Sequence, residues 1–281
     1  MTVTRAMEDR LYGIDASLDI AGTRFSAVLI MIAYQITHLR EGNSGKMIWY
    51  IFMAVFIVVV GNMISRTTTV GVFFFIMYLL YERWVIPEEM GTMNRKLFYY
   101  FGGIILVITP IFIYLYHTDL AFQENLRFGF EGFFSLVEKG KWEVHSNEML
   151  KDMYVFPDNL KTWIIGDGYF VGTENVDPYY IGEKWKIGFY KGTDVGYLRF
   201  IFYFGLTGLM AFSVFMCKVA QVCMNRFTPY KSLFFVILLL NFAVWFKVST
   251  DIFLVFALFL CMTETEDQMV KQEPLSDKLV S

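Results

Sequence analysis

Long apolar runs separated by short polar segments dominate the chain. Each run has about the 20 residues that an α-helix needs to cross about 30 Å of hydrocarbon. Because only helices and closed barrels satisfy their backbone groups within lipid, runs of this length predict membrane-spanning helices. They cover Ala21 to His38, Met47 to Ile64, Thr69 to Ile86, Leu97 to Tyr116 and Val195 to Ala220. The predicted fold class is therefore an all-α integral membrane protein, a bundle of transmembrane helices.

A further apolar stretch, Leu233 to Met262, is divided by the polar sequence Lys247-Val-Ser-Thr-Asp251. One interpretation is a hairpin of two short helices with the polar turn at the outer surface or in a cavity of the bundle. The other is one tilted helix with Lys247 and Asp251 paired at i, i+4 in mid-membrane. The hairpin is favoured, because a mid-membrane ion pair is costly whereas Lys247 at a turn can reach water. The bundle then has about seven spans, or about six if this stretch is a single helix.

Composition agrees with a lipid environment. Hydrophobic residues make up 56% of the chain and charged residues only 18%, against about a quarter charged in soluble domains. The net charge of −3 and the dispersed basic residues give no indication of a nucleic-acid partner. The N-terminus lacks the apolar core of a cleavable signal peptide. It looks more like a loop that follows an earlier helix, so we expect the chain to be a C-terminal portion of a longer enzyme.

Lys and Arg in the short loops set the orientation. If the spans alternate, one side of the membrane collects Arg40 and Lys46, Arg83, Arg95 and Lys96, and Lys218, Arg226 and Lys231. The positive-inside rule makes that side cytoplasmic. The predicted organisation is an external segment at 1–20, a four-helix membrane region at 21–117, a large external loop at 118–194 between the fourth and fifth spans, a membrane region at 195–263 and a cytoplasmic tail at 264–281.

The external loop, at roughly 75 residues, is far longer than an ordinary connection, and such loops are commonly functional or disordered. Its many aromatic residues, among them Trp142, Trp163 and Trp185, argue against disorder. We expect it to fold into a cap on the membrane. Its aromatic rings could bind the apolar faces of sugars or could simply form the cap's own core.

The cationic residues singled out on the outer side or just within its boundary are Arg24, Arg66, Arg127, Arg199 and Lys247. Arg66 lies in the short turn Ile64-Ser-Arg-Thr-Thr-Thr, where a planar guanidinium suits phosphate recognition. The neighbouring hydroxyls could bind sugar or phosphate, or could cap the next helix. Arg24 and Arg199 could instead be interfacial anchors. Asp194 stands at the expected N-cap of a helix, where capping and catalysis are both open.

Several stretches together resemble the O-antigen polymerase and O-antigen ligase family of bacterial membrane glycosyltransferases. The turn Ser65-Arg66-Thr67-Thr68 looks like the Ser-Arg-small motif of that family, and Arg127 lies early in the external loop. Ile165-Gly-Asp-Gly-Tyr169, Asp194-Val-Gly-Tyr-Leu198 and Phe204-Gly-Leu-Thr-Gly-Leu209 are similar to its signature running from the loop into a helix. The resemblance covers about Ala21 to Met262.

The resemblance implies work on undecaprenyl-pyrophosphate-linked sugars at the outer face of the bacterial cytoplasmic membrane, without a metal or another cofactor. Arg66 and Arg127 would hold the pyrophosphate, with Arg24, Arg199 and Tyr197 as further candidate substrate contacts. Asp194 is the first candidate for the base and Glu131 the second. Asp194 stands where ligases carry His, which favours a polymerase. Alternatives are ligation onto a lipid acceptor, a polysaccharide flippase or transport component, and an inactive membrane subunit. Expected partners are the lipid-linked glycan, membrane lipid and other polysaccharide assembly proteins.

Overall fold

The computed structural model describes residues 18–39, 44–85, 91–170 and 189–262. These residues form helices and connecting segments, with no strand among them. The chain divides into two units, Met1–Val144 and His145–Ser281, and each is described by itself. Predictions that fall on 1–17, 40–43, 86–90, 171–188 and 263–281, including Arg40, Trp185 and the tail at 264–281, lie outside the described residues.

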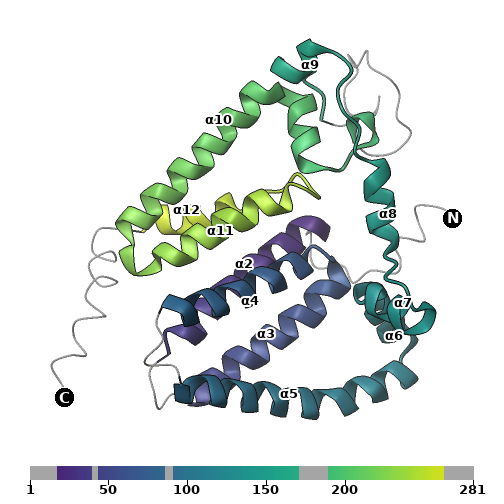
Figure 1. Cartoon of the computed structure of the whole chain (residues 1–281), viewed down its shortest axis with the longest axis vertical. Helices are drawn as coiled ribbons and strands as arrows, with labels where there is room; N and C mark the ends of the chain where they lie inside the picture. The colour runs from purple at the N-terminus through teal and green to yellow at the C-terminus, as the bar shows by residue number, and fades with distance from the viewer. Residues whose placement is uncertain (1–17, 40–43, 86–90, 171–188, 263–281) are drawn as a thin grey trace. The chain divides into compact units, whose positions relative to one another are not determined.

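The first unit is built from long apolar helices followed by two short ones. Its helices are α2 (Leu18–Thr37), α3 (Ser44–Ile64), α4 (Thr68–Val85), α5 (Gly91–Thr118), α6 (Leu120–Gly129) and α7 (Glu131–Lys139). The four long helices coincide within a few residues with the first four apolar runs. Helix α2 packs against α3 and α4, and α5 packs against α3 (Figure 1).

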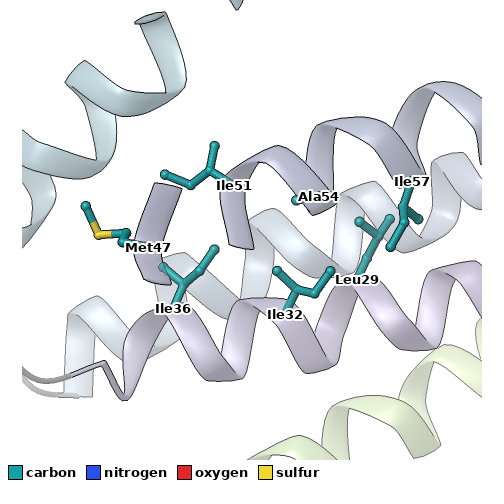
Figure 2. Packing of buried hydrophobic residues seen from close by; sticks show 7 residues of the cluster. All are labelled: Leu29, Ile32, Ile36, Met47, Ile51, Ala54 and Ile57. Carbon is teal, nitrogen blue, oxygen red and sulfur yellow. The ribbon is translucent and has the colours of Figure 1, made fainter. Parts of the chain in front are cut away.

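The contact between α2 and α3 is a row of interlocking aliphatic side chains. Residues three or four apart lie on the same face of a helix, and the apolar positions of α2 at that spacing meet those of α3 (Figure 2). The buried cluster consists of Leu29, Ile32, Ile36, Met47, Ile51, Ala54 and Ile57. Within lipid, such van der Waals packing is the main attraction between helices, since the surrounding chains are equally apolar.

Small residues bring α2 and α4 into backbone contact. A Cβ added at Gly71 of α4 would lie 2.5 Å from the Ser26 Cβ atom on α2, and closer still to the Ser26 Cα atom. On α2 itself, a Cβ at Gly22 would lie 2.9 Å from the Ser65 side chain. Gly22 and Ser26 are four residues apart, the spacing of small residues that is common at helix interfaces in membranes.

The second unit contains α8 (His145–Asp152), α9 (Leu160–Ile165), η1 (Tyr190–Gly192), α10 (Gly196–Arg226), η2 (Thr228–Tyr230), α11 (Lys231–Val244) and α12 (Phe253–Leu260). Both α11 and α12 pack against α10. Residues 245–252 between them are not α-helical, and the Asp251 carboxylate accepts the backbone N–H of Phe253 at 2.9 Å. The stretch is thus two helices, and the alternative of one tilted helix is wrong.

Helix α10 bends at Gly205, so the predicted span from Val195 to Ala220 is not one straight helix. Gly205 has φ 68° and ψ −177°, a conformation open almost only to glycine. A bend leaves carbonyls of the first arm without helical partners. The segment after α9 supplies donors: the Asp167 N–H reaches the Phe202 carbonyl oxygen at 2.6 Å, and the Gly168 N–H reaches that of Tyr203 at 3.0 Å. The bend beside α9 is visible in Figure 1.

Four helical segments are long and apolar enough to cross a membrane: Asp19–Thr37, Gly45–Ile64, Tyr99–Thr118 and Gly196–Arg226. Thr68–Glu82 and Thr228–Val244 are shorter apolar helices. In Tyr99–Thr118 no residue of the most apolar window is buried, and Leu106 is 74% exposed. Since large apolar surfaces are rarely left to water, these helices indicate a membrane protein.

Candidate functional site

The turn between α3 and α4 is held from behind by Asp19 of α2. Asp19 Oδ1 accepts hydrogen bonds from the hydroxyls of Ser65 at 2.9 Å and Thr67 at 3.0 Å. The Ser65 hydroxyl also accepts the backbone N–H of Thr67 at 3.3 Å. These hydroxyls therefore fix the turn to α2. Asp19 was missed because it lies in the polar stretch ahead of the first apolar run.

Arg66 and Glu131, two of the predicted site residues, meet at this turn. The Arg66 guanidinium forms an ion pair with the Glu131 carboxylate and lies 4.4 Å from the centre of the Phe128 ring. The side chain of Arg66 is 14% exposed and that of Glu131 34%. Gly129 permits the approach of α6, because a Cβ there would lie 3.0 Å from the Asn62 carbonyl oxygen.

Arg127, on α6, forms a second ion pair in the same unit. Its guanidinium donates to both Glu138 carboxylate oxygens at 2.8 and 2.9 Å and to the Tyr116 hydroxyl at 3.0 Å, and lies 4.9 Å from the Phe134 ring centre. The hydrogen bonds with Tyr116 and then Glu138 raise the pKa of Arg127 above its usual value, so it stays protonated. We call Arg66, Arg127, Phe128, Glu131 and Glu138 the Arg66 cluster.

Asp194 and Arg199 come together in the second unit, where the predicted helix cap is wrong. The N-cap of α10 is Val195, without a side-chain cap. The Asp194 carboxylate instead lies 3.5 Å from the Arg199 guanidinium, whose side chain is only 8% exposed. Phe170 and Phe189 place their ring centres 3.9 and 3.6 Å from that guanidinium. Burial brings Asp194 to Arg199 because a buried cation needs a counter-ion.

Tyr197 and Arg24 stand apart from these two groups. The Tyr197 hydroxyl donates to the Phe242 carbonyl oxygen at 3.0 Å, and its ring packs on Trp245 and Phe246. Tyr197 thus joins α10 to the end of α11. Arg24 lies exposed on α2, and the contacts of the described residues place it in neither group.

No family model, curated protein or solved structure matches this chain.

The Arg66 cluster can bind an oxyanion by exchange of partners. Arg127 and Glu138 are 41% and 47% exposed, and exposed ion pairs contribute only about 0–1 kcal/mol. A phosphate oxygen can therefore replace a carboxylate on the guanidinium at little cost. Among the described residues, no three His, Cys, Asp or Glu side chains are arranged to hold a metal ion. Glu138 and Phe128 were missed as site residues, because carboxylates and rings of this kind are abundant along residues 118–194.

Proposed function

We propose that the chain polymerises undecaprenyl-pyrophosphate-linked oligosaccharide repeat units at the outer face of the bacterial cytoplasmic membrane, with residues 118–194 outside. The observation that carries the proposal is the ion pair of Arg66 with Glu131 at the start of α7, together with Arg127 on the preceding helix α6. Two cations and a carboxylate on the α3–α4 turn and the adjoining helices α6 and α7 match the needs of glycosyl transfer from a lipid pyrophosphate: charge stabilisation for the leaving group and a base for the attacking hydroxyl.

In the proposed reaction a sugar hydroxyl of one repeat unit attacks the anomeric carbon of the growing chain. The new glycosidic bond forms as the bond from that carbon to the pyrophosphate oxygen breaks, and the lipid pyrophosphate leaves. Arg66 and Arg127 hold its negative charge. The hydroxyl proton passes to a carboxylate. Glu131 is the stronger of the two candidate bases, because transfer of Arg66 from Glu131 to the phosphate releases the glutamate as the donor binds.

An apolar cavity of the first unit supports a lipid-linked donor. It measures about 410 Å³ and is lined by residues of α3 and α5 together with Leu126 and Phe134. Tyr116 and Phe134 line this cavity and also contact Arg127. A prenyl chain lying in the cavity would bring its pyrophosphate to the guanidinium.

The test is complementation of a bacterial strain whose own polysaccharide polymerase has been deleted. The wild-type chain should restore a ladder of polymer lengths, and Arg127→Ala and Arg66→Ala should reduce it to single repeats, since loss of one charge-stabilising donor lowers the rate by roughly 10²-fold or more. Lys139→Ala is the matched control. Lys139 is an exposed cation of α7 that pairs with Glu143 at 2.8 Å, and its loss should leave the ladder unchanged.

The same assay distinguishes Glu131 from Asp194 as the base. Glu131→Gln should abolish the ladder, whereas Asp194→Asn should do so only if Asp194 is the base. A normal polymer that stays on its lipid carrier would indicate a ligase instead, and lipid-linked repeats accumulating inside the cell would indicate transport. A ladder that survives Arg66→Ala and Arg127→Ala would refute the proposal.

A further inference from the structure

The second unit contains a polar cavity of about 340 Å³ that plays no part in the proposed transfer. Its walls come from the segment before α9, from α9, from the segment after it, from η1 and from the first arm of α10. Its volume lies within the range of small-molecule sites, roughly 300–1,000 Å³. Four of its wall residues are ionic: Asp158, Lys161, Asp167 and Lys191. The two positive and two negative side chains balance, so the cavity favours no net charge in a ligand.

Asp167 is fixed in the wall as a hydrogen-bond acceptor. Its Oδ1 accepts the Thr162 hydroxyl at 2.7 Å, its Oδ2 accepts the Tyr190 hydroxyl at 3.3 Å, and Lys161 Nζ lies 3.8 Å from Oδ1. Its backbone is held by the bond to Phe202 at the bend of α10. A carboxylate has about four acceptor positions, so these bonds orient Asp167 and leave it able to accept a ligand hydroxyl.

Aromatic rings form an adjoining wall. Tyr169 and Tyr190 lie with ring centres 5.5 Å apart, and Tyr190 meets Phe202 edge to face at 5.6 Å. All three residues line the cavity, and because Tyr190 and Phe202 are buried in the core of the unit, the partly exposed Tyr169 is the one that presents its ring. An aromatic face offers an apolar surface beside polar tips, which matches a sugar ring, whose C–H groups form an apolar face and whose hydroxyls need donors and acceptors.

Lys191, in the cavity wall, has an unfavourable backbone conformation. It has φ 56°, and among the described residues it is the only one other than glycine with a positive φ. Glycine, or asparagine, adopts this conformation far more readily. A strained residue in the wall of a cavity points to a use for its side chain there, in this case an ammonium group with three donors.

We infer that this cavity binds an uncharged sugar ring, such as a hexose or an N-acetylhexosamine. Asp167 accepts from the hydroxyls, Lys161 and Lys191 donate to them, and the Tyr169 ring covers the C–H face. The inference goes beyond the proposed function. It concerns residues of the second unit only, and sugar binding can be measured without any transfer reaction.

Binding is tested on the purified full chain in lipid nanodiscs by saturation-transfer NMR. The probes are glucose, galactose and N-acetylglucosamine, with glucuronate and inorganic phosphate as anionic comparisons. At least one neutral sugar should receive saturation. Asp167→Asn should weaken its binding roughly tenfold, the effect of losing a charge-assisted hydrogen bond. Asp152→Asn, an exposed carboxylate of α8, is the matched control and should bind as the wild type does.

Lys191→Gly separates binding from folding. It should weaken sugar binding while raising the thermal unfolding midpoint, because glycine relieves the backbone strain. Binding of phosphate or glucuronate in preference to neutral sugars would overturn the inference, as would unchanged binding by Asp167→Asn or no binding of any probe. Neutral-sugar binding in a chain that forms no polymer ladder would contradict the proposed function alone.

Discussion

Gly205 is the residue on which the bend of α10 depends, and Gly205→Ala should be strongly destabilising. The left-handed backbone conformation costs about 1–3 kcal/mol for a residue with a side chain. The new Cβ would also lie 2.5 Å from the Ile165 nitrogen and closer still to the Ile164 carbonyl oxygen, and such overlap adds about 1–3 kcal/mol. The two contributions together amount to about 4 kcal/mol.

Two other glycines separate the strain from the overlap. Gly168 has φ 80° but open space around a Cβ, so Gly168→Ala should show the strain alone, about 1–3 kcal/mol. Gly102 lies in helix α5 with nothing within 4 Å. Gly102→Ala should stabilise by about 0.5–1 kcal/mol, because alanine loses less freedom in a helix.

The three variants are compared by thermal unfolding in detergent. Unfolding is followed by the reactivity of Cys223, which is fully buried on α10. The other two cysteines, Cys217 and Cys261, are exposed and are replaced by serine, so that a maleimide dye reacts only when Cys223 is uncovered. At about 2–4 °C per kcal/mol, Gly205→Ala should lower the midpoint by roughly 8–16 °C. Equal midpoints for Gly205→Ala and wild type would refute the bend and the contacts built on it.

Two further predictions concern the first unit. Gly71→Leu should separate α2 from α4, because its Cβ would overlap the Ser26 backbone; the unfolding midpoint should fall, and an unchanged midpoint would argue against the close approach. Lys139 lowers the pKa of the Glu143 carboxyl through a hydrogen bond and its charge, and Lys141 adds a smaller effect of charge. The stabilisation by this pair is present above the ordinary carboxyl pKa and is lost as pH falls through the lowered one. In ¹³C NMR titrations, Lys139→Met should therefore raise the pKa of Glu143 more than Lys141→Met does, and equal shifts would contradict the geometry.

Apolar run length was sufficient to predict the long helices, because a span is recognised from local sequence alone. The division of the last apolar stretch was also predictable, since Lys247 and Asp251 are costly inside lipid. The bend at Gly205 was not predictable, because a single glycine in an apolar run is compatible with a straight helix and its conformation is decided by the segment after α9. Residues 118–194 were predicted to form a folded segment, but the helices that its described residues form were not predicted.

In the candidate site, too, single residues could be recognised from the neighbouring sequence, whereas their pairing partners could not. Arg66 could be singled out from the sequence, because a charged residue in a short turn between two apolar helices is unusual and often has a function. Its pairing with Glu131 depends on the packing of α6 against α3 through Gly129, which no local pattern encodes. Asp194 was expected at the N-cap from its position ahead of a helix, with catalysis left open, but the structure pairs it with the buried Arg199.

The attachment of the α3–α4 turn to Asp19 also bears on the entropy of binding. Freezing a flexible loop when a ligand arrives subtracts from affinity. Here the peptide segment that carries Arg66 is already tied at two hydroxyls to the first turn of α2, so only the guanidinium has to change partners. The turn is preorganised, and the proposed donor would meet a cation whose backbone is ordered before it arrives.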